Sequence, residues 1–146
     1  MNPSKRRKAR ELAIQAIYAW QISKNIVISE ITKYVVHHNK KCSLDIEYFN
    51  QVVSGVIKNV HYLDNIIKLH ISQTNIRINP VEQSILRLSA HEIIQRIDIP
   101  YKVIINEGIE LAKIFGSSKS HKFVNGVLDK IIYEKNKIKT IQQYKK

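Results

Sequence analysis

The stretch INPVEQSILRLSAHEIIQR, residues 78–96, carries the clearest helix signal in the chain. A residue that precedes proline is disfavoured in the α conformation, so a helix cannot extend back across Asn79, whereas Pro80 itself fits a first helical turn. Beyond Pro80 the apolar residues fall on most faces of the helix and not along one stripe, which is typical of a helix enclosed on several sides. The sequence therefore predicts that residues 80–96 form a central, buried helix.

Helical periodicity continues on both sides of this segment. The dipeptide Ile99-Pro100 repeats the punctuation of Asn79-Pro80, and Gly116 is suited to end the helix that follows. No segment shows the sustained alternation of a strand. Besides 80–96, the predicted helices are 8–22, 28–38, 45–58 (led by Asp45), 60–71, 100–115 and 118–133.

These segments predict an all-α fold of about six to seven helices. We expect one domain, 1–146, made of two packed helical subdomains at about 1–75 and 76–134 that meet near residues 72–79, followed by a basic tail, 135–146. A chain of 146 residues is long enough to bury a sizeable core. It has one cysteine and no apolar run near the ~18 residues of a membrane span, so a soluble cytoplasmic protein is expected.

The net charge of +12 is concentrated at the two ends of the chain. Residues 1–10 hold five cations and residues 135–146 hold five lysines, with no acid in either segment, whereas the body between them has 14 cations against 12 acids. Lysine excess can follow from nucleotide composition alone, but three of the six arginines lie within residues 6–10. This clustering favours the N-terminal patch as a contact for a polyanion.

Helical-wheel positions suggest two contact surfaces. In the first helix, Ala9, Leu12 and Trp20 point inward. Ile14, Gln15 and Tyr18 fall on the opposite face beside the cations, with Arg10 and Gln21 at its edge. In helix 118–133, Phe123 falls beside the core stripe and next to lysines, as expected of a ring that stacks on a base of single-stranded RNA. A solvated helix face in the first case, and a Phe packed against a neighbouring helix in the second, remain open alternatives.

No catalytic or cofactor-binding pattern is present. The four glycines are isolated, so there is no phosphate-binding loop, and there is no HExxH motif. His37, His38 and Cys42 lack a fourth ligand at suitable spacing for a metal. The sequence therefore predicts a binding protein and not an enzyme. We expect no metal site, no cofactor and no small-molecule substrate.

Four stretches resemble the NusB family of bacterial transcription antitermination factors, in order from residue 5 to about 133. They are RRKARELAIQAIYAWQ (6–21), NPVEQSILRLSAHEI (79–93), IPYKVIINEGIELAKIFG (99–116) and SHKFVNGVLDKI (120–131). The resemblance implies a fold of two helical subdomains and binding to single-stranded boxA RNA of ribosomal RNA leader transcripts. The family does this with NusE, a ribosomal small-subunit protein. The complex joins RNA polymerase with NusA and NusG, and so supports complete transcription of ribosomal RNA operons.

Matched residue by residue, the resemblance also implies site residues. Tyr18 and Glu82 would meet NusE or the RNA beside it. RNA contacts would come from Lys5, Arg6, Arg7, Lys8, Arg10, Lys113, Lys122, Phe123 and Asn125, with Phe115 and His121 nearby. Phe115 falls on the apolar face of its helix and is a weaker candidate than Phe123. Gly108 and Lys119 depart from the family pattern, which usually has Ala and an acid there.

Two other functions remain open at this point. NusB-like helical domains also form the N-terminal part of ribosomal RNA cytosine methyltransferases. Those enzymes carry an α/β cofactor domain, and this sequence shows none, so under this alternative the chain would be a detached piece of such an enzyme. A protein-binding adaptor with an incidental basic arm is the third possibility.

Overall fold

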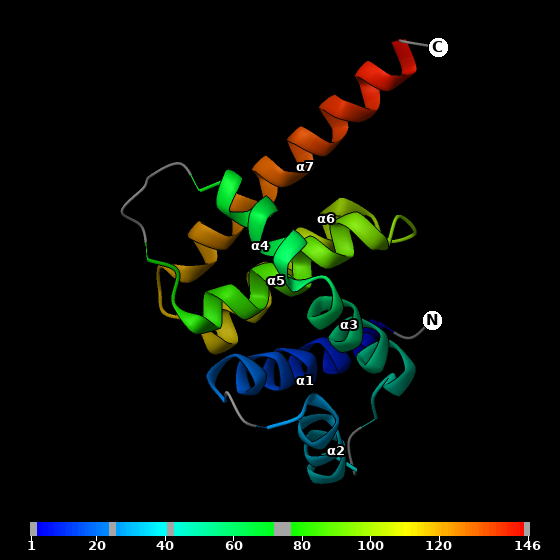
Figure 1. Ribbon diagram of the computed structural model, residues 1–146, viewed down its shortest axis with the longest axis vertical. Helices are drawn as coiled ribbons and strands as arrows, with labels where there is room; N and C mark the ends of the chain where they lie inside the picture. The colour runs from blue at the N-terminus through cyan, green and yellow to red at the C-terminus, as the bar shows by residue number, and fades with distance from the viewer. Residues whose placement is uncertain (1–2, 24–25, 41–42, 72–76, 145–146) are drawn as a thin grey trace.

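The computed structural model describes residues 3–23, 26–40, 43–71 and 77–144, and within them it contains seven α-helices and no strand (Figure 1). The prediction of an all-α fold is therefore confirmed. The helices are α1 (Pro3–Ile22), α2 (Ile28–His38), α3 (Ile46–Lys58), α4 (Val60–Leu69), α5 (Pro80–Gln95), α6 (Tyr101–Phe115) and α7 (Ser120–Tyr144).

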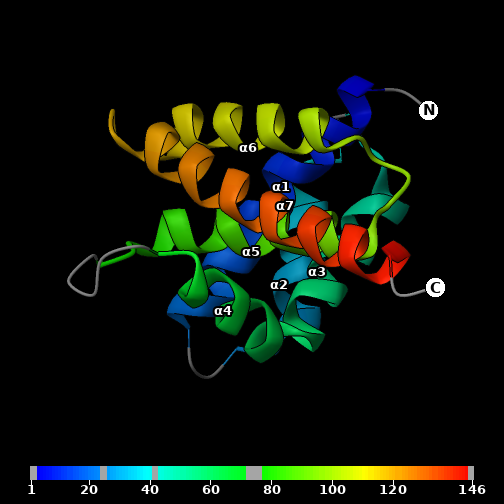
Figure 2. The ribbon, with the colours of Figure 1, turned by 90° about the horizontal axis from the view of Figure 1, so that it is seen from above.

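Helix α5 is the centre of the fold, as its sequence predicts. Every residue from Ser84 to Ile93 is buried, and α5 packs against α1, α3, α4, α6 and α7. Figure 2 shows α5 with α6 on one side and α4 on the other. Its start is fixed locally, because the Asn79 side chain accepts a hydrogen bond from the backbone N–H of Glu82 and the Glu82 carboxylate accepts one from the backbone N–H of Asn79. This capping box satisfies two backbone donors that would otherwise lack partners.

Buried side chains on both sides of α5 in the sequence form one hydrophobic core. Leu12 of α1 and Phe49 of α3 belong to the same cluster as Leu111 of α6 and Leu128 of α7. The boundary predicted near residues 72–79 falls mainly on residues 72–76, which lie outside the described residues. The described parts of the two predicted subdomains thus share one core, with α5 at its middle.

Most helix ends follow the sequence signals. Asp45 caps α3 by accepting from the backbone N–H of Tyr48, Asn59 separates α3 from α4, and Gly116 ends α6. The first helix begins at Pro3 and not at residue 8, because proline fits a first helical turn. The last helix continues to Tyr144, beyond the predicted end at 133. None of the described helices is both long and apolar enough to cross a membrane.

Gly108 has a packing role that the sequence alone does not reveal. It is buried in α6, where a Cβ atom would lie 3.0 Å from Leu128 Cδ1 of α7 and 3.2 Å from Ser89 Oγ of α5. The glycine weakens the helix by up to about 1 kcal/mol relative to alanine, but it lets three helices approach closely. An alanine here would require both neighbours to move by a few tenths of an ångström.

Candidate nucleic-acid and partner interface

Helix α1 buries a wider arc than one amphipathic stripe. The prediction that Ile14 is exposed is wrong, because Ile14 is 2% exposed, and Ile17 is fully buried beside it. The reason is that α1 packs against α2, α3 and α5 at once. Tyr18 and Gln15 do face solvent, as the helical wheel predicts.

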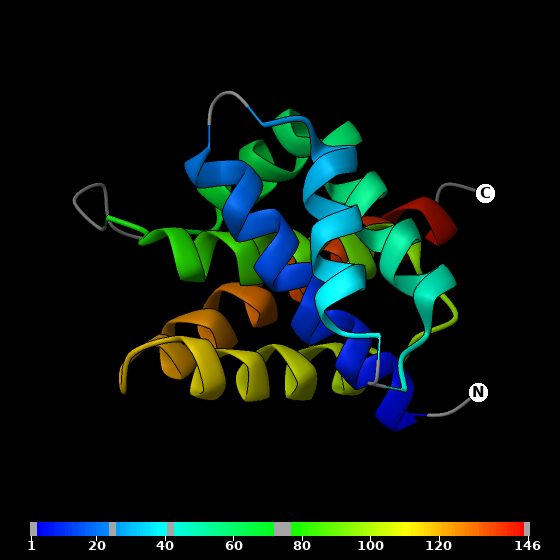
Figure 3. The same cartoon turned by 90° about the horizontal axis from the view of Figure 1, so that it is seen from below.

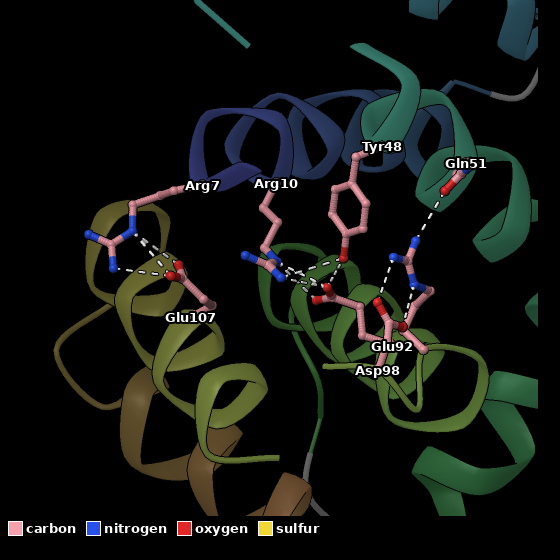
Figure 4. A network of polar contacts seen from close by, with 8 residues as sticks. Arg7, Arg10, Tyr48, Gln51, Glu92, Asp98 and Glu107 are labelled. Atoms are coloured by element: carbon pink, nitrogen blue, oxygen red, sulfur yellow. Dashed lines mark hydrogen bonds and ion pairs between the residues drawn. The ribbon is translucent and has the colours of Figure 1, made fainter. Parts of the chain in front are cut away.

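Arg10 also lies inside the protein, which excludes it from the predicted phosphate contacts. Its guanidinium donates to both carboxylate oxygens of Glu92, with Nε–Oε1 at 3.2 Å and Nη2–Oε2 at 2.9 Å (Figure 4), and Arg10 is 2% exposed. The Tyr48 hydroxyl donates to the same carboxylate. Burial lowers the pKa of Arg10, but the charge and hydrogen bonds of Glu92 outweigh it and raise the pKa overall. Arg10 therefore holds α1 to α5.

The remaining N-terminal cations differ in how far they are neutralised. Arg7 donates from Nε and Nη2 to the carboxylate of Glu107 on α6, and Lys8 Nζ lies 3.6 Å from Glu11 Oε2. Lys5 is exposed and makes no ion pair with the residues that the structure describes. Arg6 stacks its guanidinium on the Tyr48 ring, 4.2 Å from the ring centroid. Lys5 and Arg6 are thus the cations of this patch without a carboxylate partner among the described residues.

Helices α1 and α6 both pack on α5 (Figure 3). Residues of α1 and α6 line two hollows, the second of which is also lined by Val81 of α5. The polar hollow, of about 370 Å³, is lined by Ser4, Arg7, Lys8, Glu11 and Glu107. The apolar hollow, of about 220 Å³, is lined by Ile14, Gln15, Tyr18, Val81 and Phe115. We refer to the two hollows together as the α1–α6 surface.

The apolar hollow brings Tyr18 next to Phe115, which the sequence had made a weaker candidate. Tyr18 is 39% exposed and Phe115 is half-buried. Glu82 follows Val81 but is 9% exposed, and its carboxylate is used in the capping box of α5. The structure therefore gives Glu82 a role in folding and not an exposed carboxylate for a partner.

The other predicted RNA contacts lie at the end of α6 and the start of α7. Lys122 is exposed, and Lys113 is exposed with its Nζ 3.7 Å from Glu110. Phe123 and Asn125 are half-buried, and the Phe123 ring packs partly against the core. The packing interpretation of Phe123 therefore holds in part, and stacking of its exposed part on a base stays a prediction. Lys119 is exposed in the connecting turn, where the Ser117 backbone N–H donates to Ser120 Oγ.

Sequence reasoning missed one residue of the apolar hollow, Val81, which lines it from α5. It also missed the pairing of Glu107 with Arg7, which spans 100 positions of the chain. No local pattern reports such a contact.

The structure shows no group of three His, Cys, Asp or Glu residues that could hold a metal ion among the residues that it describes. Cys42, one of the three metal candidates named from the sequence, lies outside the described residues.

Comparisons with known proteins agree over most of the chain. The profile described as "NusB family" matches residues 7–133. Two similar proteins carry the description "Transcription antitermination protein NusB". The one from Buchnera aphidicola (subspecies Cinara cedri) is 66% identical over 136 residues, 93% of this chain and 96% of that protein. The one from Erwinia tasmaniensis is 51% identical over 130 residues, 89% of this chain and 93% of that protein.

Solved structures show the same fold. T. maritima NusB matches with a TM-score of 0.77 and 27% identity, over 88% of this chain and 90% of that one. A chain from the structure described as antitermination factors NusB and NusE in complex with dsRNA matches with a TM-score of 0.80 and 28% identity, over 91% of this chain and 99% of that one. By profile, sequence and fold, the chain belongs to the NusB family of transcription antitermination proteins, which are not enzymes.

Proposed function

We propose that the protein binds boxA RNA of ribosomal RNA leader transcripts together with NusE. The complex joins RNA polymerase, NusA and NusG in the cytoplasm and suppresses premature termination. The observation that carries the proposal is the α1–α6 surface, where exposed cations at the start of α1 adjoin a hollow lined by Tyr18 and Phe115. Similarity to a chain solved with NusE and dsRNA supports NusE and RNA as the partners.

Phosphates of the RNA contact the cations at the start of α1, of which Arg7 and Lys8 line the polar hollow. Lys5 and Arg6 have no carboxylate partner among the described residues, and Arg7 and Lys8 lie beside them with partly exposed side chains. Lys113 and Lys122 extend the positive surface to the end of α6 and the start of α7. Such contacts supply affinity that falls as salt rises, because binding releases counterions.

Single-stranded RNA fits this surface better than a duplex does. The exposed part of the Phe123 ring offers a face on which an unstacked base can lie, and Asn125 is a donor and acceptor for base edges. A duplex keeps its bases stacked on one another and would leave this ring unused. Recognition of boxA therefore rests on bases splayed out at the start of α7.

NusE docks at the apolar hollow. Tyr18 presents an apolar ring with a polar tip, a combination enriched at protein interfaces. The hollow beside it is lined by Ile14, Val81 and Phe115, and it can receive an apolar side chain of the partner. The proposed RNA and protein surfaces are thus adjacent along α1.

Replacing Arg6 and Arg7 together with alanine is expected to weaken boxA RNA binding about tenfold or more and to flatten its dependence on salt. Loss of two phosphate contacts on a single strand changes the slope of log K against log salt by roughly 1.4. Titration of labelled boxA RNA in the presence of NusE at two salt concentrations measures both quantities.

The matched control is the pair Lys33→Ala and Lys68→Ala, which removes the same charge from exposed positions on α2 and α4. This control is expected to bind within about threefold of wild type, through net charge alone. RNA affinity and salt slope that survive the Arg6/Arg7 change, or that fall equally in the control, would show that the start of α1 does not contact RNA.

A further inference from the structure

The Glu107 carboxylate forms an ion pair with Arg7, one of the cations that we propose to face the RNA. Arg7 Nε lies 3.1 Å from Glu107 Oε2, and Arg7 Nη2 lies 3.1 Å from Oε1. The Arg7 side chain is 53% exposed, whereas that of Glu107 is 13% exposed. Figure 4 shows Glu107 reaching from α6 to the guanidinium at the start of α1. The acid is thus the fixed member of the pair, and the arginine is the accessible one.

A phosphate and the Glu107 carboxylate compete for the same donors. An arginine fork binds carboxylate and phosphate in the same planar, two-bond geometry. Glu107 occupies the edge formed by Nε and Nη2. A phosphate must displace Glu107 there, or approach the other edge of the guanidinium, where the negative charge of Glu107 still repels it. In both cases the net gain from Arg7 is smaller than that from a free arginine.

Carboxylates neutralise a large part of the N-terminal patch in this way. Arg10 pairs with Glu92 and Lys8 with Glu11, in addition to Arg7 with Glu107. The first of these pairs is buried and structural, whereas the Arg7 pair lies at the rim of the polar hollow. Glu107 is therefore the partly buried acid whose removal frees an exposed arginine for RNA.

We propose that Glu107 is a specificity-determining residue that holds Arg7 back from weakly bound polyanions. An RNA gains the Arg7 contact only when its other contacts, to Lys5 and Arg6 and to the base-reading residues of α7, keep a phosphate in place long enough to displace the carboxylate. The inference rests on the proposed function. Without the carboxylate, Arg7 binds any phosphate, so unrelated RNA gains more affinity than boxA RNA does.

The variant Glu107→Gln tests this in the full chain, because glutamine keeps the shape of the side chain and removes its charge. We expect it to bind a scrambled RNA about five- to tenfold more tightly and boxA RNA about two- to threefold more tightly, with a steeper salt slope for both. The variant Arg7→Ala with Glu107→Gln, compared with Arg7→Ala alone, should show less than a twofold gain. Fluorescence titration with labelled boxA and scrambled RNA measures all four proteins.

The control Glu30→Gln makes the same charge change at an exposed residue of α2 with no ion pair among the described residues. It should change neither affinity by more than about twofold. Unchanged or weaker RNA binding by Glu107→Gln, or an equal gain in the Arg7→Ala background, would overturn the inference. A wild-type protein that binds neither RNA would overturn the proposed function as well, whereas wild-type binding with no gain from Glu107→Gln overturns this inference alone.

Discussion

Replacing Glu92 with alanine is expected to lower the free energy of unfolding by about 3–5 kcal/mol, the range for breaking a buried ion pair. The change leaves the guanidinium of Arg10, 2% exposed, and the hydroxyl of Tyr48 without their shared acceptor. A buried charge without a partner is costly because it has lost its hydration. Urea denaturation followed by circular dichroism measures the loss.

Two further variants make this prediction specific to the buried network. Glu110→Ala removes an acid of α6 whose side chain is 47% exposed, and it is expected to cost less than about 0.5 kcal/mol. Glu92→Gln keeps an acceptor for Tyr48, so it provides a folded reference of intermediate stability if the alanine variant does not fold. A loss below about 1 kcal/mol in Glu92→Ala would contradict the pairing of Arg10 described above.

Alanine substitution at two helical glycines is expected to have opposite effects on stability. At Gly55 of α3, a Cβ atom would lie 2.3 Å from Cε1 of His91, whose ring is buried on α5. We expect Gly55→Ala to destabilise the protein by about 1–3 kcal/mol, because the core must open to accept the methyl group. At Gly126 of α7 a Cβ atom meets nothing within 4 Å, so Gly126→Ala should stabilise by about 0.5–1 kcal/mol.

Thermal unfolding of the two variants side by side checks the difference in sign. Both changes raise helix propensity equally, so any difference between them comes from packing. Gly55→Ala combined with His91→Ala should recover part of the lost stability, because the smaller side chain makes room. A stabilising effect of Gly55→Ala alone would show that α3 and α5 are not in close contact at this point.

Much of the fold could be predicted because its signals are local. The dipeptide Asn79-Pro80 and the apolar faces of residues 80–96 identified the central helix, and Asp45 and Gly116 marked helix ends that the structure confirms. The last helix was predicted too short. Polar sequence after residue 133 argues against burial, but it does not stop a helix whose first turns are already anchored in the core.

The candidate site could be predicted less completely, because partners distant in sequence decide which cations are free. Within RRKAR nothing distinguishes Arg10 from Arg7, since the difference depends on Glu92, 82 positions away, and on Glu107, 100 positions away. The arc of α1 that is buried likewise depends on three neighbouring helices, which is why Ile14 was misplaced. Glu82 is the opposite case, because the capping pattern Asn79-x-x-Glu82 is visible in the sequence.

Specific binding of boxA RNA at the α1–α6 surface, together with NusE, can be measured directly. The most direct measurement is titration of the protein with labelled boxA RNA and with a scrambled RNA of the same length, with and without NusE, at two salt concentrations. We expect tighter binding of boxA RNA, a preference that grows when NusE is present, and affinity that falls as salt rises. Equal affinity for the two RNAs under all of these conditions would show that the protein does not recognise boxA RNA.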